Sequence, residues 1–376
     1  MRFPPTRDTA IERLESFLPN AAKYAKLRNF DFGPAERSNV SGLSPYLRTR
    51  LITEDEVSRA VLGRFAASSV DKFLQEVAWR TYWKGWLEMR PQVWDRYLSD
   101  LDGLDRSDDY DAAIAGRTGI DCFDSWAREL VEHGYLHNHT RMWFASIWVF
   151  TLRLPWQLGA DFFMRHLLDG DPASNTLSWR WVAGLHTKGK HYLARASNIA
   201  KYTDGRFNPT GQLDESAGPL PQDHEFERMP LELQDFSPPD GRIGHLVLAD
   251  DLAPPPCEVM STGVATECLR EAAQPVHNFL RGALEDTRQR YGGVALTGDL
   301  GEAVQAWVAD EKLDAIVVAR PAVGPWRQVL DNLEAGVPVH PFVREWDRKL
   351  WPSATAGFFK LRKQLPKFFD SLAVSG

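Results

Sequence analysis

The sequence has little cysteine and no long apolar run, and both shortages narrow the class of protein. Its 376 residues hold three cysteines, Cys122, Cys257 and Cys268, which are unevenly spaced and odd in number. This pattern argues against a disulfide framework and a four-cysteine metal site, so we expect free thiols. No apolar stretch approaches the roughly 20 residues that a membrane span needs, and the N-terminus is charged rather than signal-like. We expect a cytoplasmic protein without membrane contact.

Motifs of several common enzyme classes are also missing. No GxGxxG or P-loop string follows a predicted strand, which argues against a conventional dinucleotide or NTP site. No GxSxG elbow occurs in the order that hydrolases need, so hydrolytic chemistry has little support. The string HGYLHNHTRM at 133–142 clusters histidines, but it lacks a cysteine partner and an HExxH pattern. We therefore expect no metal.

The chain is instead rich in tryptophan and uneven in charge. Ten of its 14 tryptophans precede residue 182. Residues 1–215 carry 28 basic and 28 acidic side chains, so the remaining 16 basic and 23 acidic residues produce the net charge of -7. Within the neutral part, the segment 176–203 has five Lys and Arg residues and no acidic one. Such a stripe can bind phosphates or simply form a solvated face.

Apolar periodicity divides the chain into two parts with different rhythms. From about residue 8 to 200 the apolar residues recur at helical spacing, whereas prolines interrupt every pattern from 204 to 242. Beyond this segment, short β-branched runs alternate with helical stretches, which is typical of a parallel sheet of about four strands. We predict a mostly helical domain at 1–203, a Pro-rich linker or wrapping segment at 204–242, and a small α/β domain at 243–376.

Two strings in the helical part contain residue types that bind ligands. In SNVSGLSPYLRTR, Ser41 and Ser44 precede a proline that suits a helix start, which can bind an anion or simply cap the helix. In LLDGDPASNTLSWRW, Asp169 and Asp171 stand two residues apart and Asn175 follows. Such carboxylates can bind a metal, act as acid and base, hold a polar cofactor, or cap a loop. The residues alone leave these alternatives open.

Taken together and in order, these strings resemble the helical FAD-binding domain of the photolyase and cryptochrome flavoproteins. The similarity starts at Phe3 and Pro4 and continues through YAKLRNF, SGLSPYL, EVAWRTYW, GRTGIDCFDSWAREL, HNHTRM and FMRHLLDGDPASNTLSWRW. It covers about 200 residues in six ordered motifs. The α/β unit follows this domain here, whereas family members begin with it, so the arrangement resembles a shortened circular permutation.

The resemblance implies FAD as the cofactor, held in a folded form. It assigns Tyr24, Ser41, Gly42, Leu43 and Ser44 to the FAD phosphates, and Arg80, Arg141, Asp169, Asp171 and Asn175 to the flavin. Asp169 would pair with Arg141, and Asn175 would face flavin N5. Two positions depart from the family: Val40 replaces a usual Thr and Arg50 replaces a typical Gly, which implies rearranged phosphate contacts. We expect no second, antenna chromophore.

The resemblance also implies UV-damaged DNA as the partner. The family's pocket for a flipped cyclobutane pyrimidine dimer corresponds here to Glu76, Trp79, Asn138, Met142 and Trp181, and all five residue types are present. The two tryptophans would form flat walls for the dimer, with stacking worth roughly 1 to 3 kcal/mol for each base. Relatives that repair the (6-4) lesion carry His at two of these positions, so the cyclobutane dimer is favoured.

Further residues would contact the DNA backbone or supply electrons. The candidates for phosphate contacts are Arg28, Arg180, Lys188 and Lys190, and His139 replaces a DNA-contacting Arg of the family. Trp179 and Trp156 match the proximal and middle positions of the family's tryptophan triad. The distal position falls near Gly103, so light-driven reduction would either use a different terminal donor, such as another Trp or Tyr, or be poor.

The sequence therefore favours a light-dependent deoxyribodipyrimidine photo-lyase, with Glu76, Asn175, Trp179 and Trp156 as its catalytic residues and no obligate protein partner. The alternative is a cryptochrome-type blue-light photoreceptor that binds FAD without repair. A purely structural helical protein would account for core tryptophans such as Trp83 and Trp148, but it does not explain six ordered motifs.

Overall fold

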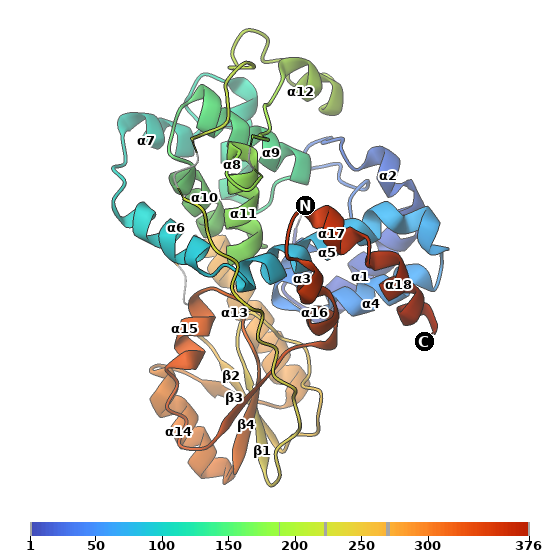
Figure 1. Ribbon diagram of the computed structural model, residues 1–376, viewed down its shortest axis with the longest axis vertical. Coiled ribbons are helices and arrows are strands. Elements are labelled where there is room, and N and C mark those ends of the chain that lie inside the picture. Colours follow the sequence, from blue (N-terminus) through green and yellow to red (C-terminus); the bar gives the residue numbers. More distant parts are fainter. Residues whose placement is uncertain (1, 188, 222–223, 268–270, 375–376) are drawn as a thin grey trace.

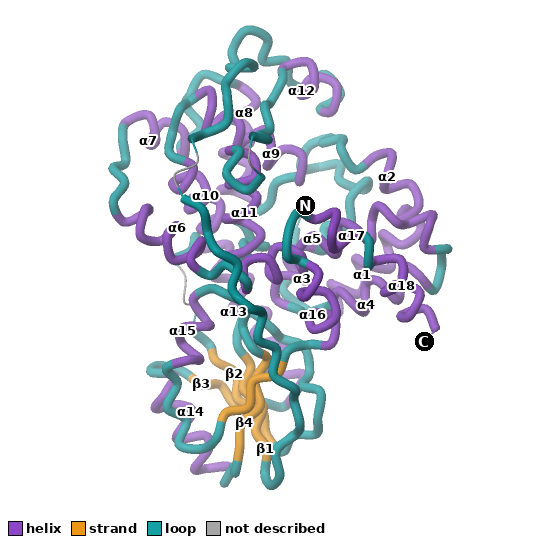
Figure 2. The backbone as a smooth tube through the Cα atoms, in the orientation of Figure 1, coloured by secondary structure: helices purple, strands orange, loops and turns teal. Residues whose placement is uncertain are grey.

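The chain folds into a helical region and a smaller sheet region. The computed structural model describes residues 2–187, 189–221, 224–267 and 271–374. Figure 1 shows the first two hundred residues as a cluster of helices, with the sheet beneath it and the last helices returning to the cluster. In Figure 2 the strands of the described residues all lie in the smaller region. The predicted fold class, a mostly helical part followed by a small parallel sheet, is confirmed.

The helical region is arranged around one long helix, α5 (Ala67–Glu88). Helices α4 and α11 pack directly against it. The other elements of this region are α1 (Arg7–Phe17), η1 (Leu18–Lys23), α2 (Tyr24–Leu27), α3 (Ser44–Thr49), α4 (Glu54–Leu62), α6 (Gln92–Asp102), α7 (Asp108–Ile114), α8 (Asp121–His133), α9 (Asn138–Ser146), η2 (Ile147–Thr151), α10 (Trp156–His166), α11 (Pro172–Ala183) and α12 (Ala196–Tyr202).

Local sequence signals set the ends of the helices that position the site. Thr53 and Glu56 form a capping box at the start of α4, because each side chain bonds the backbone N–H of the other residue. Asp171 caps α11 by accepting a hydrogen bond from the Ser174 N–H at 2.7 Å, and a proline occupies the first helical position. Gly184 ends α11 at a φ of 86°, which glycine adopts without steric cost.

The sheet contains β1 (Ile243–Val247), β2 (Ser261–Ala265), β3 (Val294–Leu296), β4 (Ala315–Ala319) and β5 (Val339–Phe342) in the order β3-β2-β1-β4-β5, with all neighbouring pairs parallel. Its helices are α13 (Gln274–Tyr291), α14 (Leu300–Glu311) and α15 (Pro325–Asp331). The sequence predicted about four strands and missed β2, whose residues STGVA give a weak strand signal. Gly263 of β2 lies against Trp307, which a Cβ atom would approach to 3.0 Å.

The segment 204–242 wraps around the molecule and has no helix or strand among its described residues. Its Phe207 packs edge-on against Trp126 of α8 at 5.6 Å. Further along, Phe236 contacts Phe342 at the other end of the molecule and covers a small second core around Ile243 and Val317. Of the two predicted descriptions, linker or wrapping segment, these contacts favour the second.

The last helices of the chain leave the sheet and pack on the helical region (Figure 1). They are α16 (Glu345–Leu350), η3 (Trp351–Ser353), α17 (Phe358–Arg362) and α18 (Leu365–Val374), and they contact α4 and α5. Trp351 can approach because Gly85 has no side chain, and a Cβ there would lie 2.8 Å from the indole ring. The predicted α/β unit 243–376 is therefore too long, since its sheet ends at β5 and the remainder belongs to the helical core.

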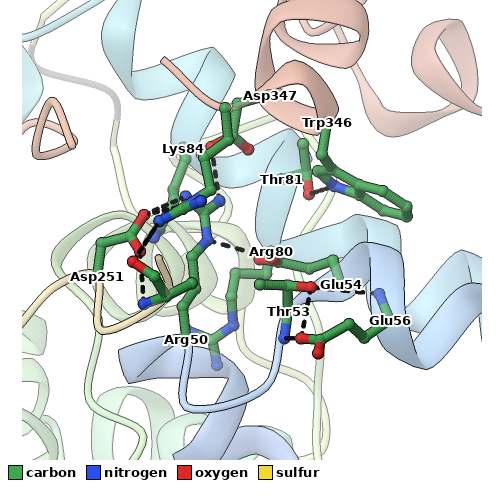
Figure 3. Close-up of polar contacts among 12 residues, drawn as sticks. Arg50, Thr53, Glu54, Glu56, Arg80, Thr81, Lys84, Asp251, Trp346 and Asp347 are labelled. Carbon is green, nitrogen blue, oxygen red and sulfur yellow. Dashed lines mark hydrogen bonds and ion pairs between the residues drawn. The ribbon is translucent and has the colours of Figure 1, made fainter. Parts of the chain in front are cut away.

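A buried ion cluster joins the three parts of the chain (Figure 3). The guanidinium of Arg50 lies 3.2 Å from Glu54, 2.9 Å from Asp251 after β1, and 2.6 Å from Asp347 of α16. Arg344 also binds Asp251, at 2.6 Å. Burial would lower the pKa of Arg50, but the three carboxylates raise it well above its ordinary value. Its guanidinium thus joins the helical, sheet and C-terminal parts.

Two further predictions concern the thiols and the membrane. Cys122 and Cys257 are free, as expected, and Cys268 lies outside the described residues. None of the helices in the described part of the chain is both long and apolar enough to cross a bilayer.

Candidate functional site

Helix α5 carries three predicted site residues, Glu76, Trp79 and Arg80, within about one turn. The Glu76 carboxylate forms an ion pair with Arg28, and the ammonium of Lys72 lies 3.5 Å from it. Arg28 was predicted as a contact for DNA phosphates, whereas the structure gives its guanidinium a partner in the site itself. A paired carboxylate accepts hydrogen bonds, so Glu76 acts as an acceptor here.

Two buried aspartates face cations from several helices. Asp169 pairs with Arg141 of α9 at 2.9 Å, as predicted. Asp171 lies 3.6 Å from Lys84 and 3.9 Å from Arg80, both on α5. Burial would raise the pKa of each aspartate, but the adjacent cations outweigh it and lower both pKa values. Both carboxylates are therefore charged at neutral pH.

Polar atoms left unpaired beside these aspartates fit a polar ring system. Arg80 Nη1 is buried and has no hydrogen-bond acceptor among the described residues, and Asp169 Oδ1 likewise lacks a donor. Buried polar atoms in native proteins are nearly always paired, so such orphans indicate a missing partner. The isoalloxazine ring of FAD presents an N–H donor and carbonyl acceptors at one edge. The residues present therefore fit the flavin.

The phosphate turn, residues 41–44, which was predicted to contact the FAD phosphates, lies next to this pair of aspartates. Gly42 has a φ of 62°, and the N–H of the buried Leu43 lies 3.4 Å from Ser41 Oγ. Ser44 opens α3, and Arg48 of the same helix donates to Gly170 O between the two aspartates at 2.8 Å, which connects the turn to the flavin residues. Tyr24 packs against Phe73 of α5 at 5.3 Å. The turn and the aspartates thus form one continuous polar wall.

Asn175 and the two predicted electron-transfer tryptophans lie behind that wall. The Asn175 amide donates to Ala160 O of α10 at 2.8 Å. Trp179 is buried, and Gly159 gives it room, because a Cβ there would come within 2.3 Å of the indole ring. Trp156 begins α10 and stacks on Tyr97 of α6 at 5.6 Å. Tyr97 was not among the predicted residues.

The two aromatic walls of the predicted lesion pocket are engaged by rings of this chain. Trp79 stacks face to face on Phe358 of α17, with ring centroids 3.8 Å apart and planes 10° apart. Trp181 stacks on Tyr192 at 5.9 Å. Of the remaining predicted pocket residues, Asn138 is exposed and Met142 is half-buried. Phe358 therefore covers the flat surface that was predicted to receive a base.

His139, predicted to replace a DNA-contacting arginine, is bound inside the protein. Its ring stacks on Trp143 at 4.1 Å, and its nitrogens lie 3.0 Å from Asn29 O and 3.3 Å from the Tyr192 hydroxyl. Burial lowers its pKa, so the ring is neutral at pH 7. His139 accordingly supplies no positive charge to a phosphate.

Of the other predicted phosphate contacts, Lys190 is exposed and Lys188 lies outside the described residues. Arg180 is the exception, because it is only 6% exposed. Its guanidinium lies over the rings of Trp156 at 5.7 Å and Phe226 at 5.3 Å, and the three residues line a cavity of about 640 Å³. Arg180 is therefore buried and does not reach a DNA backbone, in contrast to the prediction.

Besides Tyr97, the sequence prediction missed three residues that shape this site. Lys84 follows Arg80 by four residues on the same helix, so helical periodicity could have brought it to Asp171. Arg48 follows the phosphate turn, and its Nε donates to Gly170 O, between the two aspartates, at 2.8 Å. No sequence pattern could have predicted the contact of Phe358 with Trp79, because the two residues are 279 positions apart.

Comparison with known proteins connects this geometry to one family. Residues 73–214 match the family model described as the FAD binding domain of DNA photolyase. Within these residues the helical region is similar to that domain. The matched segment includes Glu76, Trp79 and both aspartates. The predicted resemblance to the photolyase and cryptochrome family is confirmed for this segment.

Two curated relatives are both named deoxyribodipyrimidine photo-lyase. The deoxyribodipyrimidine photo-lyase of Agrobacterium fabrum is 33% identical over 190 residues, which cover 48% of this chain and 39% of that protein. The deoxyribodipyrimidine photo-lyase of Alkalihalophilus pseudofirmus is 32% identical over 207 residues, covering 54% of this chain and 42% of the relative. The chain thus spans about two fifths of the length of these photolyases.

Solved structures show the same partial overlap. A bacterial class III photolyase from Agrobacterium tumefaciens aligns with 27% identity and a TM-score of 0.46 over 53% of this chain and 43% of that chain. A cryptochrome from Synechocystis aligns with 21% identity and a TM-score of 0.47 over 54% of this chain and 44% of the other.

Proposed function

We propose that this protein is a light-dependent DNA repair lyase that splits cyclobutane pyrimidine dimers. FAD is its cofactor and UV-damaged DNA is its partner. The observation that carries the proposal is the arrangement on α5, where Glu76 and Trp79 are followed directly by Arg80, which reaches Asp171. One helix thereby connects residues suited to a pyrimidine with residues suited to a flavin. The photolyase-related segment includes all of them.

The polar groups on this face match the hydrogen-bonding edge of a pyrimidine. A thymine presents one N–H donor flanked by carbonyl acceptors. The Glu76 carboxylate can accept from the N–H, and the paired guanidinium of Arg28 can donate to a carbonyl. Trp79 adds a flat apolar surface for the ring. These groups select a planar amide-bearing ring rather than a sugar or a phosphate.

FAD would be held by the polar wall beside the next turns of α5, at Arg80 and Lys84. Arg80, Lys84 and Arg141 supply positive charge there, while Asp169 and Asp171 fix their positions. Reduced FAD, when bound and excited by blue light, supplies the electron that opens the cyclobutane ring. The cations beside the aspartates favour a negatively charged ligand, because charges interact strongly where water is excluded.

A second candidate function, a cryptochrome-type photoreceptor, is favoured by one observation. Phe358 occupies the face of Trp79 that a base would need, at 3.8 Å. A protein that binds FAD and signals without repair has no need of that surface. Such a protein would bind DNA without regard to lesions and would change its oligomeric state in light.

Two substitutions test the repair function. We expect Glu76→Ala and Trp181→Ala to reduce the rate of dimer splitting in light by about fivefold to a hundredfold, because each removes a contact worth about 1 to 3 kcal/mol. The control is Glu132→Ala, since the side chain of Glu132 is 74% exposed at the end of α8. Unchanged repair in both site variants would contradict the proposed function. Retained FAD absorbance would show that the variants keep the cofactor site.

A further inference from the structure

The C-terminal helix α17 places an aromatic side chain on the proposed base-binding surface. Phe358 is 5% exposed and stacks on Trp79 with ring planes 10° apart, which is the geometry of a stacked base. Its ring also meets Tyr82 edge-on at 5.6 Å. A base can stack on this face of Trp79 only after Phe358 has moved.

Few polar contacts hold α17 over the site. The Tyr82 hydroxyl donates to Ala356 O at 2.9 Å, and Arg90 donates to Thr355 O at 3.1 Å. The next ion pair is the long one between Arg362 and Asp71 at 4.0 Å, in which both side chains are about half exposed. Exposed pairs of this kind contribute little to stability. By contrast, Trp351 is anchored deeply against Gly85.

The charge of this segment suits a DNA backbone. Residues 348–369 carry six basic side chains and no acidic one, although the part of the chain after residue 215 is acidic overall. Lys360, Lys363 and Lys367 are exposed, as is Phe359 at 72%. A nucleic acid that reaches Trp79 therefore meets basic side chains on the element that it must displace.

We propose that Phe358 is a specificity-determining residue that occupies the place of the base on Trp79, and that DNA binding exchanges the phenyl ring for a pyrimidine. The proposal rests on the proposed function, because it takes Trp79 as the base-binding surface. The ring closes the site to weakly stacking molecules. A base enters only when its own stacking and its phosphate contacts outweigh the lost contact between Phe358 and Trp79.

The exchange predicts opposite behaviour for two adjacent phenylalanines. Phe358→Ala removes the competing ring, so the base-binding face of Trp79 is open in every molecule. The affinity for a base should then rise by the inverse of the fraction of wild-type molecules that are open. This increase is about tenfold if one wild-type molecule in ten is open. Phe359→Ala is the matched control, because the same residue type one position later is 72% exposed. Tyr82→Phe removes the contacts of its hydroxyl with Ala356 O and with His186 Nε2 but keeps every ring, so it should give a smaller increase.

The experiment uses the full-length protein carrying FAD, in the dark. Fluorescence anisotropy measures its affinity for a labelled single-stranded oligothymidylate with one thymine dimer and for the same strand without the dimer. Circular dichroism checks that each variant retains the helical content of the wild type.

The expected result is tighter binding of the dimer strand by Phe358→Ala, with Phe359→Ala equal to the wild type. Two results would contradict the role of Phe358 without contradicting the repair function. In the first, wild type and Phe358→Ala bind the dimer strand with the same affinity. In the second, Phe358→Ala and Phe359→Ala both gain affinity by the same factor. If no variant and no wild-type protein binds either strand, the proposed function is wrong and the exchange is wrong with it.

Discussion

Arg50 Nη2 lies 2.6 Å from Asp347 Oδ2, so a residue before α4 is bonded to a residue of α16 across 297 positions. The backbone of Arg50 has a φ of 54°, in the left-handed region that favours glycine. Arg50 adopts this strained backbone conformation, and its guanidinium binds three carboxylates.

Replacing Arg50 should destabilise the protein strongly. Arg50→Ala leaves Glu54, Asp251 and Asp347 buried without their shared cation, which costs about 3 to 5 kcal/mol. Arg50→Gly loses the same ion pairs but relieves the left-handed backbone, so it should be about 1 kcal/mol less destabilised. Urea denaturation measures both values. The control Arg96→Ala breaks an exposed pair with Asp100 and should cost less than about 1 kcal/mol.

His245 should make stability depend on pH between about 4 and 6.5. It is 1% exposed in the middle of β1, and neither ring nitrogen has a hydrogen-bond partner among the described residues. Burial is the largest cause that lowers its pKa, Asp251 opposes it and Arg344 adds to it, so that the pKa falls to about 4. The unfolded chain binds a proton below about pH 6.5 while the folded chain does not, so stability falls as the pH falls through this range.

His245→Leu should therefore raise the melting temperature more at pH 5 than at pH 7.5, because leucine removes both the proton uptake of the unfolded state and the unpaired nitrogens. Differential scanning calorimetry at the two pH values measures the difference. His224→Leu, at an exposed position, should change the melting temperature equally at both pH values. An equal effect of His245→Leu at both pH values would contradict the assignment.

Gly159→Ala should disturb Trp179 and the cofactor behind it. A Cβ at this position would lie 2.3 Å from the Trp179 ring and 3.0 Å from the Trp148 ring. Such overpacking costs about 1 to 3 kcal/mol. We expect lower stability and less FAD bound per protein, measured by urea denaturation and absorbance. Gly103→Ala is the control, since the nearest atom lies at an ordinary 3.7 Å, and a control that loses as much FAD would refute the reasoning.

Tyr97→Phe should slow light-driven reduction of the cofactor. Tyr97 is buried, stacks on Trp156 at 5.6 Å and continues to Trp94 at 5.3 Å, so it extends the aromatic path where the family's distal tryptophan is missing. Phenylalanine keeps the ring but is much harder to oxidise. Loss of the oxidised-flavin absorbance under blue light measures the rate. Tyr110→Phe, which alters a buried tyrosine packed on Trp148, should leave it unchanged.

Two features of the polar wall followed from the sequence, whereas the roles of its residues toward FAD stay predictions. Asp171 and Pro172 mark the start of α11, and the pairing of Asp169 with Arg141 followed from the family resemblance. The order of the helical part and the sheet also followed from the change in periodicity. Only β2 was missed, since its small residues give little strand signal.

The contacts of the C-terminal helices could not be predicted in the same way. Asp347, Trp351 and Phe358 look like parts of an ordinary amphipathic stretch, and their partners Arg50, Gly85 and Trp79 lie more than 260 residues earlier. Such long-range packing is decided by which faces remain uncovered after the helices form. The burial of Arg180 was missed for a similar reason, because Phe226 covers it from the wrapping segment.

The most direct test is an absorbance spectrum of the purified protein, followed by blue illumination with a reductant and an oligonucleotide that carries one thymine dimer. The recovery of absorbance by the intact bases measures repair. We expect a yellow protein that restores the bases in light and leaves them damaged in the dark. A yellow protein that leaves the dimer intact under illumination would contradict the repair function and favour the photoreceptor.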